Sequence, residues 1–303
     1  GADVQAGVSV IEARLDCDKY GVFHLPFPSV IATEGLIIFS VMSNGTRVLR
    51  NCAREPEVDC LVHFLNSCGA RISGEGTGEV VVEGVRRLRG TQWELMPDRI
   101  EIGTFGCLAG VINGDITVGP VVPDHVAAVR KVFGEIGIHC EGNATNRSLT
   151  FRGRSPNRFR TAVEITAAPY PGFPSDLQPL AAALCLKGAG TSVVRDTVFP
   201  SRFGYLAEFS KLGAVVRAQP GIAYIEGCAG RLKGAELYCG DIRSGAACVL
   251  AALVAEGTSI VTNEEEISRG YHDFFGKLRS LGLSMEAVQP SQVHSEARPR
   301  SCS

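Results

Sequence analysis

The sequence predicts an α/β protein with mixed sheets that is built from one repeated unit. A glycine followed by a short β-branched run recurs along the chain, an amphipathic helical segment follows it, and a second glycine then precedes another strand. The 303 residues are 45% hydrophobic and 20% charged, which is enough apolar material for one large core or two smaller ones. The four copies span residues 45–69, 114–137, 190–213 and 257–282.

Each copy predicts two helices. Ahead of the first glycine, a helical stretch begins at a side chain that can accept a hydrogen bond from the first turn. Between the two glycines, apolar residues recur at helical spacing, and the second glycine suits the left-handed position that ends a helix. The unit therefore consists of helix, strand, helix, strand and strand, with the last two strands expected to pair. The four capping residues are Ser29, Asp98, Asp176 and Asp241.

The two ends of the chain differ from the repeat. Residues 1–4 match the strand that follows a second glycine, as at 213–216, so the chain begins in mid-repeat. We expect the preceding helix to be supplied by upstream sequence of a parent chain or by another chain. Residues 289–303 lose all periodicity and are expected to form a disordered tail.

Composition excludes several classes of function. The formal net charge of -2 leaves no global positive field, so we expect neither nucleic acid nor a membrane as a partner. The apolar runs fall well short of the roughly 20 residues that a membrane-spanning helix needs. The 11 cysteines show no C-x-x-C pair and no zinc-binding spacing. They favour a reducing compartment, so we expect a cytoplasmic protein without a metal site, with the plastid stroma as the alternative location.

One carboxylate stands at a rigid junction between a loop and a helix. In the segment 171–178, two prolines and a glycine precede Asp176. Two interpretations follow, since Asp176 either caps the helix or acts as a general base near a substrate hydroxyl. The spacing by itself favours the cap.

Three arginines lie near helix starts, where a positive charge opposes the helix dipole. Arg202 and Arg269 occupy the same place in their copies, and Arg243 follows the capping Asp241 by two residues. Helix N-termini and guanidinium groups together bind phosphate or carboxylate groups. The sequence thus predicts an anion site, unless each arginine is paired with a nearby carboxylate such as Asp241 or Glu266.

An ordered set of motifs resembles the UDP-N-acetylglucosamine 1-carboxyvinyltransferase family, which acts in peptidoglycan precursor synthesis. The resemblance runs in family order over residues 1 to about 288, and the motifs differ from those of the related shikimate-pathway synthase. It implies an enolpyruvyl transferase fold, an inside-out α/β barrel of βαβαββ units that would be incomplete here. Residues 1–97 would form part of the first domain, and 98–288 would form the second. The motifs lie at residues 51–57, 97–101, 173–178, 199–203, 241–243 and 269–271.

The resemblance also implies a reaction. Enolpyruvate would pass from phosphoenolpyruvate to the 3-hydroxyl of UDP-N-acetylglucosamine, by addition and then loss of phosphate, without a metal or an organic cofactor. Asp176 would be the base at that hydroxyl, and Arg243 and Arg269 would be catalytic groups that serve the phosphate and carboxylate charges. The family's lysine–asparagine pair and cysteine-bearing mobile loop would lie before Gly1. The residues expected to bind substrate are Ser29, Val30, Asp176, Val198, Arg202 and Asp241.

A second hypothesis belongs to a different class of function. A non-catalytic relative, or a fragment of the enzyme, would use the same residues at helix termini to bind an anionic ligand or a partner subunit. A third hypothesis is a decayed copy that does not fold stably. The workable capping chemistry at all four helix starts argues against it.

Overall fold

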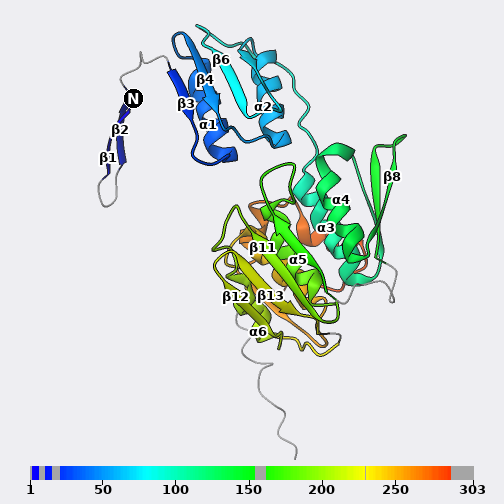
Figure 1. Ribbon diagram of the computed structural model, residues 1–303. Coiled ribbons are helices and arrows are strands. Elements are labelled where there is room, and N and C mark those ends of the chain that lie inside the picture. The colour runs from blue at the N-terminus through cyan, green and yellow to red at the C-terminus, as the bar shows by residue number, and fades with distance from the viewer. Residues whose placement is uncertain (1, 7–10, 16–20, 154–161, 229, 288–303) are drawn as a thin grey trace, which may run out of the picture. The chain divides into compact units, whose positions relative to one another are not determined.

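The structure is a computed structural model, in which residues 2–6, 11–15, 21–153, 162–228 and 230–287 are described (Figure 1). The tail expected at 289–303 lies outside these residues. The chain divides into two compact units, which are Gly1–Pro97 with Pro169–Gly172 (unit 1) and Asp98–Ala168 with Phe173–Ser303 (unit 2).

Pro169–Gly172 belongs to unit 1 although the sequence on both of its sides belongs to unit 2. One contact that ties it to unit 1 is a hydrogen bond, in which the backbone N–H of Tyr170 donates to Oε1 of Glu55 at 3.2 Å. A segment of four residues is thus held by a part of the chain more than a hundred positions away.

Unit 1 contains one complete copy of the repeat. Its sheet has the order β3-β4-β6-β5, in which β3 is parallel to β4 and the other neighbours are antiparallel. An antiparallel pair of strands, β1 (Ala2–Ala6) and β2 (Ile11–Leu15), precedes it. The elements of the copy are β3 (Gly21–His24), α1 (Val30–Val41), β4 (Thr46–Arg50), α2 (Pro56–Ser67), β5 (Arg71–Ser73) and β6 (Glu79–Glu83).

Unit 2 contains three further copies. The first lacks a leading strand among the described residues and forms a sheet of order β7-β9-β8. It comprises α3 (Arg99–Ile112), β7 (Asp115–Val118), η1 (Pro123–Val126), α4 (Ala127–Ile136), β8 (His139–Asn143) and β9 (Ser148–Arg152).

The second copy in unit 2 is complete and the third is its front half. The second comprises β10 (Glu164–Ala167), η2 (Ser175–Leu177), α5 (Gln178–Cys185), β11 (Thr191–Asp196), α6 (Tyr205–Lys211), β12 (Val216–Gln219) and β13 (Ile222–Glu226). The third comprises β14 (Glu236–Tyr238), α7 (Ile242–Ala252), β15 (Ile260–Thr262), α8 (Glu265–Ser268) and α9 (Phe274–Ser280).

The two complete copies have the same topology, which confirms the predicted repeat and the α/β class with mixed sheets. The order β10-β11-β13-β12 reproduces β3-β4-β6-β5, with the same parallel first pair and antiparallel remainder. The second glycines, at 69, 137, 213 and 282, all have positive φ, as the helix-ending role requires. The sequence pattern did not separate the leading strands of three or four residues, because so short a segment shows almost no alternation. The sheets of the described residues include no closed barrel.

The first helices of the three copies form the centre of unit 2. Helices α3, α5 and α7 contact one another, and nearly all of their residues are buried. Close packing of α3 depends on glycine, since a Cβ at Gly106 would stand 2.3 Å from Cε2 of Phe133. In unit 1 the equivalent helix α1 buries only four residues, and Ile31, Ile38 and Met42 are more than half exposed. The same place in the repeat therefore has very different surroundings in the two units.

Candidate active site

Asp176 does not cap a helix. It lies inside the short 3-10 helix η2, whose N-cap is Pro174, and α5 begins at Gln178 without a side-chain cap. The interpretation of Asp176 as an N-cap is therefore wrong, because a 3-10 turn that starts after Pro174 precedes α5, and the carboxylate bonds to Arg202 and Arg243 instead. The other three predicted caps are confirmed, since Ser29, Asp98 and Asp241 each accept a hydrogen bond from the first turn of their helices.

The Asp176 carboxylate is held between two guanidinium groups. Nη1 of Arg202 lies 2.6 Å from Oδ1, and Arg243 approaches Oδ2 with Nε at 3.2 Å and Nη2 at 3.1 Å. Arg202 precedes α6, and Arg243 stands in the first turn of α7, so three different elements supply the group. Both arginines are thus paired with a carboxylate, as the alternative interpretation has it, but the partner is Asp176, 26 and 67 positions away, rather than Asp241 or Glu266.

Ser175 and Asp196 form a second layer of contacts around Asp176 and Arg202. The buried carboxylate of Asp196 accepts a hydrogen bond from the Ser175 hydroxyl at 2.5 Å, and Nη1 of Arg202 lies 3.3 Å from the same hydroxyl oxygen. The other oxygen of Asp196 accepts from the backbone N–H groups of Val198 at 2.9 Å and Phe199 at 2.8 Å. The predicted substrate residue Val198 is thus fixed through its backbone at the end of β11, and the Phe199 ring lies 4.2 Å from the Arg202 guanidinium carbon.

Asp241 anchors the start of α7. One of its oxygens accepts from the backbone N–H groups of Arg243 and Ser244, both at 2.9 Å, and the other accepts from the Ser244 hydroxyl at 2.6 Å. The Asp241 carboxylate therefore supports Arg243 through the backbone rather than through an ion pair. A negative charge at a helix N-terminus interacts favourably with the helix dipole. The Asp241 carboxylate therefore also offsets the unfavourable interaction of the Arg243 charge with that dipole.

The Arg243 guanidinium lies over the ring of Tyr271, with its carbon 5.2 Å from the ring centroid. Tyr271 is buried, and its hydroxyl oxygen is 2.8 Å from Oγ1 of Thr104 on α3. Sequence reasoning overlooked Thr104, Ser175 and Asp196 as parts of the site. A polar residue in the middle of the apolar stretch of α3 was the signal that could have drawn attention to Thr104.

Three predicted site residues form no hydrogen bond or ion pair with Asp176, Arg202 or Arg243 in the part of the chain that the structure describes. Arg269 follows α8, is exposed, and forms an ion pair with Glu266, which matches the alternative interpretation given for it above. Ser29 caps α1 and Val30 is the first residue of that helix, so both belong to unit 1. The structure therefore brings Asp176, Arg202 and Arg243 into direct contact and places Asp241 and Val198 beside them through their backbone contacts.

Burial, neighbouring charges and hydrogen bonds together set the pKa values of the two carboxylates. Burial by itself would raise the pKa of Asp176, but the charges and hydrogen bonds of Arg243 and Arg202 bring it below its ordinary value. Burial opposes ionisation of Asp241 in the same way, and hydrogen bonds from Ser244 and from the first turn of α7 lower its pKa. Both groups are anions at neutral pH.

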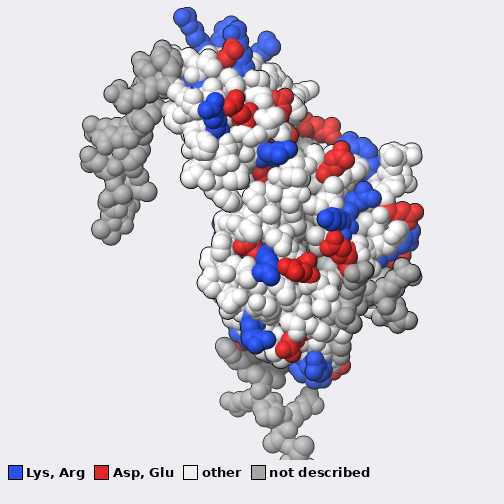
Figure 2. All heavy atoms as spheres, in the orientation of Figure 1, with Lys and Arg blue, Asp and Glu red and all other residues white. Residues whose placement is uncertain are grey.

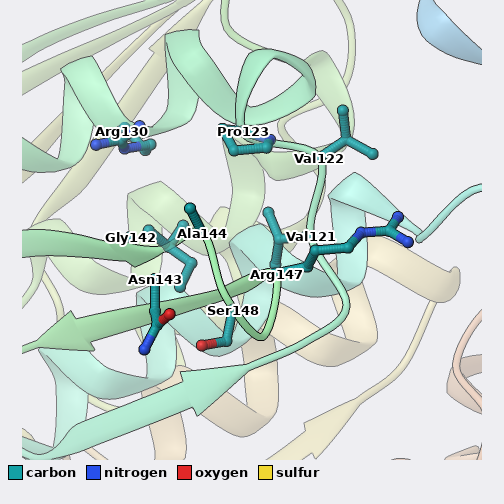
Figure 3. A pocket seen from close by; sticks show the side chains of 10 residues that line it. Val121, Val122, Pro123, Arg130, Gly142, Asn143, Ala144, Arg147 and Ser148 are labelled. Carbon is teal, nitrogen blue, oxygen red and sulfur yellow. The ribbon is translucent and has the colours of Figure 1, made fainter.

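A cavity of about 590 Å³ lies in another part of unit 2 (Figure 3). Val121 and Pro123 line it on one side and the β8–β9 hairpin lines it on the other, and none of the predicted site residues is among its lining residues. On the face shown in Figure 2, acidic and basic side chains alternate over unit 2. Within the described residues, no group of three His, Cys, Asp or Glu side chains could hold a metal ion, and no helix is long and apolar enough to cross a bilayer.

Comparison with known proteins identifies the family. The family model described as EPSP synthase (3-phosphoshikimate 1-carboxyvinyltransferase) matches residues 1–278. The chain belongs to the EPSP synthase family. Within it, curated relatives carry the name that the motifs predicted: UDP-N-acetylglucosamine 1-carboxyvinyltransferase from Gloeobacter violaceus is 37% identical over 298 residues, and the enzyme of that name numbered 2 from Caldanaerobacter subterraneus is 39% identical over 289 residues. The predicted resemblance is confirmed.

The matches cover nearly all of this EPSP synthase family chain but less of its relatives. The Gloeobacter alignment takes in 98% of the chain and 63% of the relative, and the Caldanaerobacter alignment takes in 95% and 68%. The chain thus spans somewhat less than two thirds of the Gloeobacter relative. Among solved structures, the enolpyruvyl transferase NikO from Streptomyces tendae matches with a TM-score of 0.81 at 24% identity, over 93% of the chain and 69% of NikO. This likeness supports the fold.

Proposed function

We propose that the chain carries the acid–base and anion-binding part of an enolpyruvyl transfer from phosphoenolpyruvate to the 3-hydroxyl of UDP-N-acetylglucosamine, with release of phosphate, in cytoplasmic peptidoglycan precursor synthesis. The observation that carries the proposal is the Asp176 carboxylate between Arg202 and Arg243. The names of the curated relatives support the choice of substrates.

The geometry fits the two needs of such a reaction. The attacking hydroxyl must lose a proton, and Asp176 is a partly exposed carboxylate in the short 3-10 helix η2. Phosphate and carboxylate groups must be bound, and Arg202 and Arg243 each offer several N–H donors. In the absence of substrate these donors hold Asp176 and keep its pKa low. An anionic substrate that competes for the guanidinium groups would weaken this hold and make Asp176 a stronger base.

The remaining predicted residues have proposed roles around this group. Asp241 holds the backbone at the start of α7, and Asp196 holds the backbone of Val198 after β11. Arg269, Ser29 and Val30 remain proposed substrate residues on the basis of the resemblance alone.

The test is phosphate release from phosphoenolpyruvate, measured with and without UDP-N-acetylglucosamine, on the chain and on the full reading frame that encodes it. We expect release that depends on the sugar nucleotide and that Asp176→Ala abolishes while the circular dichroism spectrum stays native. Glu164→Ala is the matched control, since Glu164 forms an exposed ion pair with Arg195 in the same unit. Normal turnover by Asp176→Ala would remove its role as the base, and no release by either protein would contradict the proposed function.

A further inference from the structure

Two buried hydroxyl groups from distant parts of the sequence meet beneath the proposed site. Thr104 lies on α3 and Tyr271 follows α8, and their oxygens are 2.8 Å apart. Thr104 is 1% exposed and Tyr271 is 2% exposed, so water cannot replace a missing partner for either hydroxyl. A buried hydroxyl without a partner costs about 1–3 kcal/mol, and both hydrogens are therefore expected to be bonded.

The direction of the bond follows from counting hydrogens. The Thr104 hydroxyl also lies 2.9 Å from the backbone carbonyl oxygen of Ile100. A carbonyl oxygen only accepts, and a threonine hydroxyl has a single hydrogen, so Thr104 donates to Ile100. The Tyr271 hydroxyl must then donate to Thr104. Its hydrogen points toward α3, and the lone pairs of its oxygen are left for other neighbours.

The neighbour that benefits is Arg243. Its guanidinium lies over the Tyr271 ring, and its charge acts to lower the pKa of the phenol, although burial has the larger effect and keeps that pKa above its ordinary value. A cation is attracted by the ring face and by the oxygen lone pairs but repelled by a hydroxyl hydrogen aimed at it. If Thr104 did not accept that hydrogen, the Tyr271 hydroxyl would be free to turn it toward the guanidinium.

Arg243 links the two hydroxyl groups to Asp176. Its Nε and Nη2 both face Asp176, and its side chain also hydrogen-bonds with Tyr271. We propose that Thr104 is a positioning residue which, by fixing the direction of the Tyr271 hydroxyl, holds the Arg243 guanidinium in the orientation in which it meets Asp176 and can bind an anionic group of the substrate. The inference rests on the proposed function for the identity of the anion, but its structural part can be tested separately.

The first experiment compares Thr104→Val with Thr104→Ser in the enolpyruvyl transfer assay. Valine keeps the shape and removes the acceptor, while serine keeps the acceptor. We expect Thr104→Val to raise KM for phosphoenolpyruvate about tenfold, with a smaller change in KM for the sugar nucleotide, and Thr104→Ser to stay within about twofold of the wild type. Equal losses in both variants would assign the effect to packing and overturn the inference.

A double-mutant cycle adds a second arm. Tyr271→Phe removes the hydroxyl whose direction Thr104 fixes. The KM for phosphoenolpyruvate of the double variant Thr104→Val/Tyr271→Phe should therefore be little higher than that of either single variant. Effects that multiply fully would mean that the two residues act independently, which contradicts the inference. Thermal unfolding of each variant checks that the protein is folded.

A third arm needs no activity. The Nε–H resonance of Arg243 in ¹⁵N NMR should exchange with water faster in Thr104→Val than in the wild type, and it should keep its wild-type rate in Thr104→Ser. The affinity for inorganic phosphate, measured by calorimetry, should be weaker in Thr104→Val than in the wild type and unchanged in Thr104→Ser. Wild-type exchange and wild-type phosphate binding in Thr104→Val would overturn the inference even if the enzyme is active. If the wild type releases no phosphate, only the proposed function fails, and this arm still decides the role of Thr104.

Discussion

The ammonium group of Lys187 donates a hydrogen bond to the carbonyl oxygen of Gly110 at 2.9 Å and another to that of Val111, so that a lysine after α5 binds the C-terminal end of α3. A cation is favourable at that end of a helix, where the last carbonyl groups lack partners. Burial nevertheless lowers the pKa of Lys187 from 10.5 to about 8.

This pKa predicts how stability depends on alkaline pH. Below about pH 8 Lys187 is protonated in both states, and the cost of burying its charge is fully present. Between about pH 8 and 10.5 the unfolded chain binds more protons than the folded protein, so this group makes the free energy of unfolding rise with pH. Urea denaturation at several pH values should show that contribution, and Lys187→Met should lack it. An identical pH slope in the variant would contradict the prediction.

Asp176 predicts the opposite behaviour in acid. Its pKa is lowered from 3.8, so its contribution to stability is complete above that value and is lost as the pH falls through the folded pKa. We expect the difference in unfolding free energy between the wild type and Asp176→Asn to shrink as the pH is lowered from 5 toward about 2. The measurement is denaturant unfolding in that range. Glu164→Gln, at an exposed ion pair, serves as the control with a smaller difference at every pH.

The cap of α3 predicts a change in stability of ordinary size. Asp98 accepts hydrogen bonds from the backbone N–H groups of Ile100 at 2.7 Å and Glu101 at 3.1 Å. Asp98→Ala should lower the free energy of unfolding by about 1 kcal/mol, and Asp98→Asn by much less, because asparagine caps nearly as well. Chemical denaturation measures both. Equal losses for the two variants would show that the charge, rather than the hydrogen bonds, is what matters.

Two helical glycines predict opposite effects of the same substitution. A Cβ at Gly106 on α3 would meet Phe133 at 2.3 Å and Phe151 at 2.9 Å, so Gly106→Ala should destabilise unit 2 by about 1–3 kcal/mol. At Gly134 on α4 nothing lies within 4 Å, and Gly134→Ala should stabilise by about 0.5–1 kcal/mol. Thermal unfolding should show a lower midpoint for the first variant and a higher one for the second.

The repeat, its helices and three of its four caps could be predicted from the sequence, because each depends on residues close together in the chain. Asp98 and Asp241 bond to the turn that follows them, and periodicity reveals that turn. Asp176 was interpreted as a cap for the same local reason, and the interpretation failed because Pro174 starts a 3-10 turn there.

Contacts between distant residues were not visible in the sequence. Ser175 meets Asp196 across 21 positions, and Thr104 meets Tyr271 across 167. No periodicity or capping rule connects such pairs, because packing of whole elements brings them together. The family resemblance identified Asp176, Arg202 and Arg243 as functional residues. It did not show that the carboxylate of Asp176 pairs with the two guanidinium groups.

The place of Pro169–Gly172 in unit 1 has a practical consequence for cutting the protein into pieces. The polypeptide passes between the units at Pro97–Asp98, again at Ala168–Pro169, and a third time at Gly172–Phe173. A fragment that starts at Asp98 would carry Tyr170 without Glu55, the partner that binds its backbone. The segment ends four residues before Asp176, so a shortened protein would lose a backbone contact close to the carboxylate on which the proposed chemistry depends.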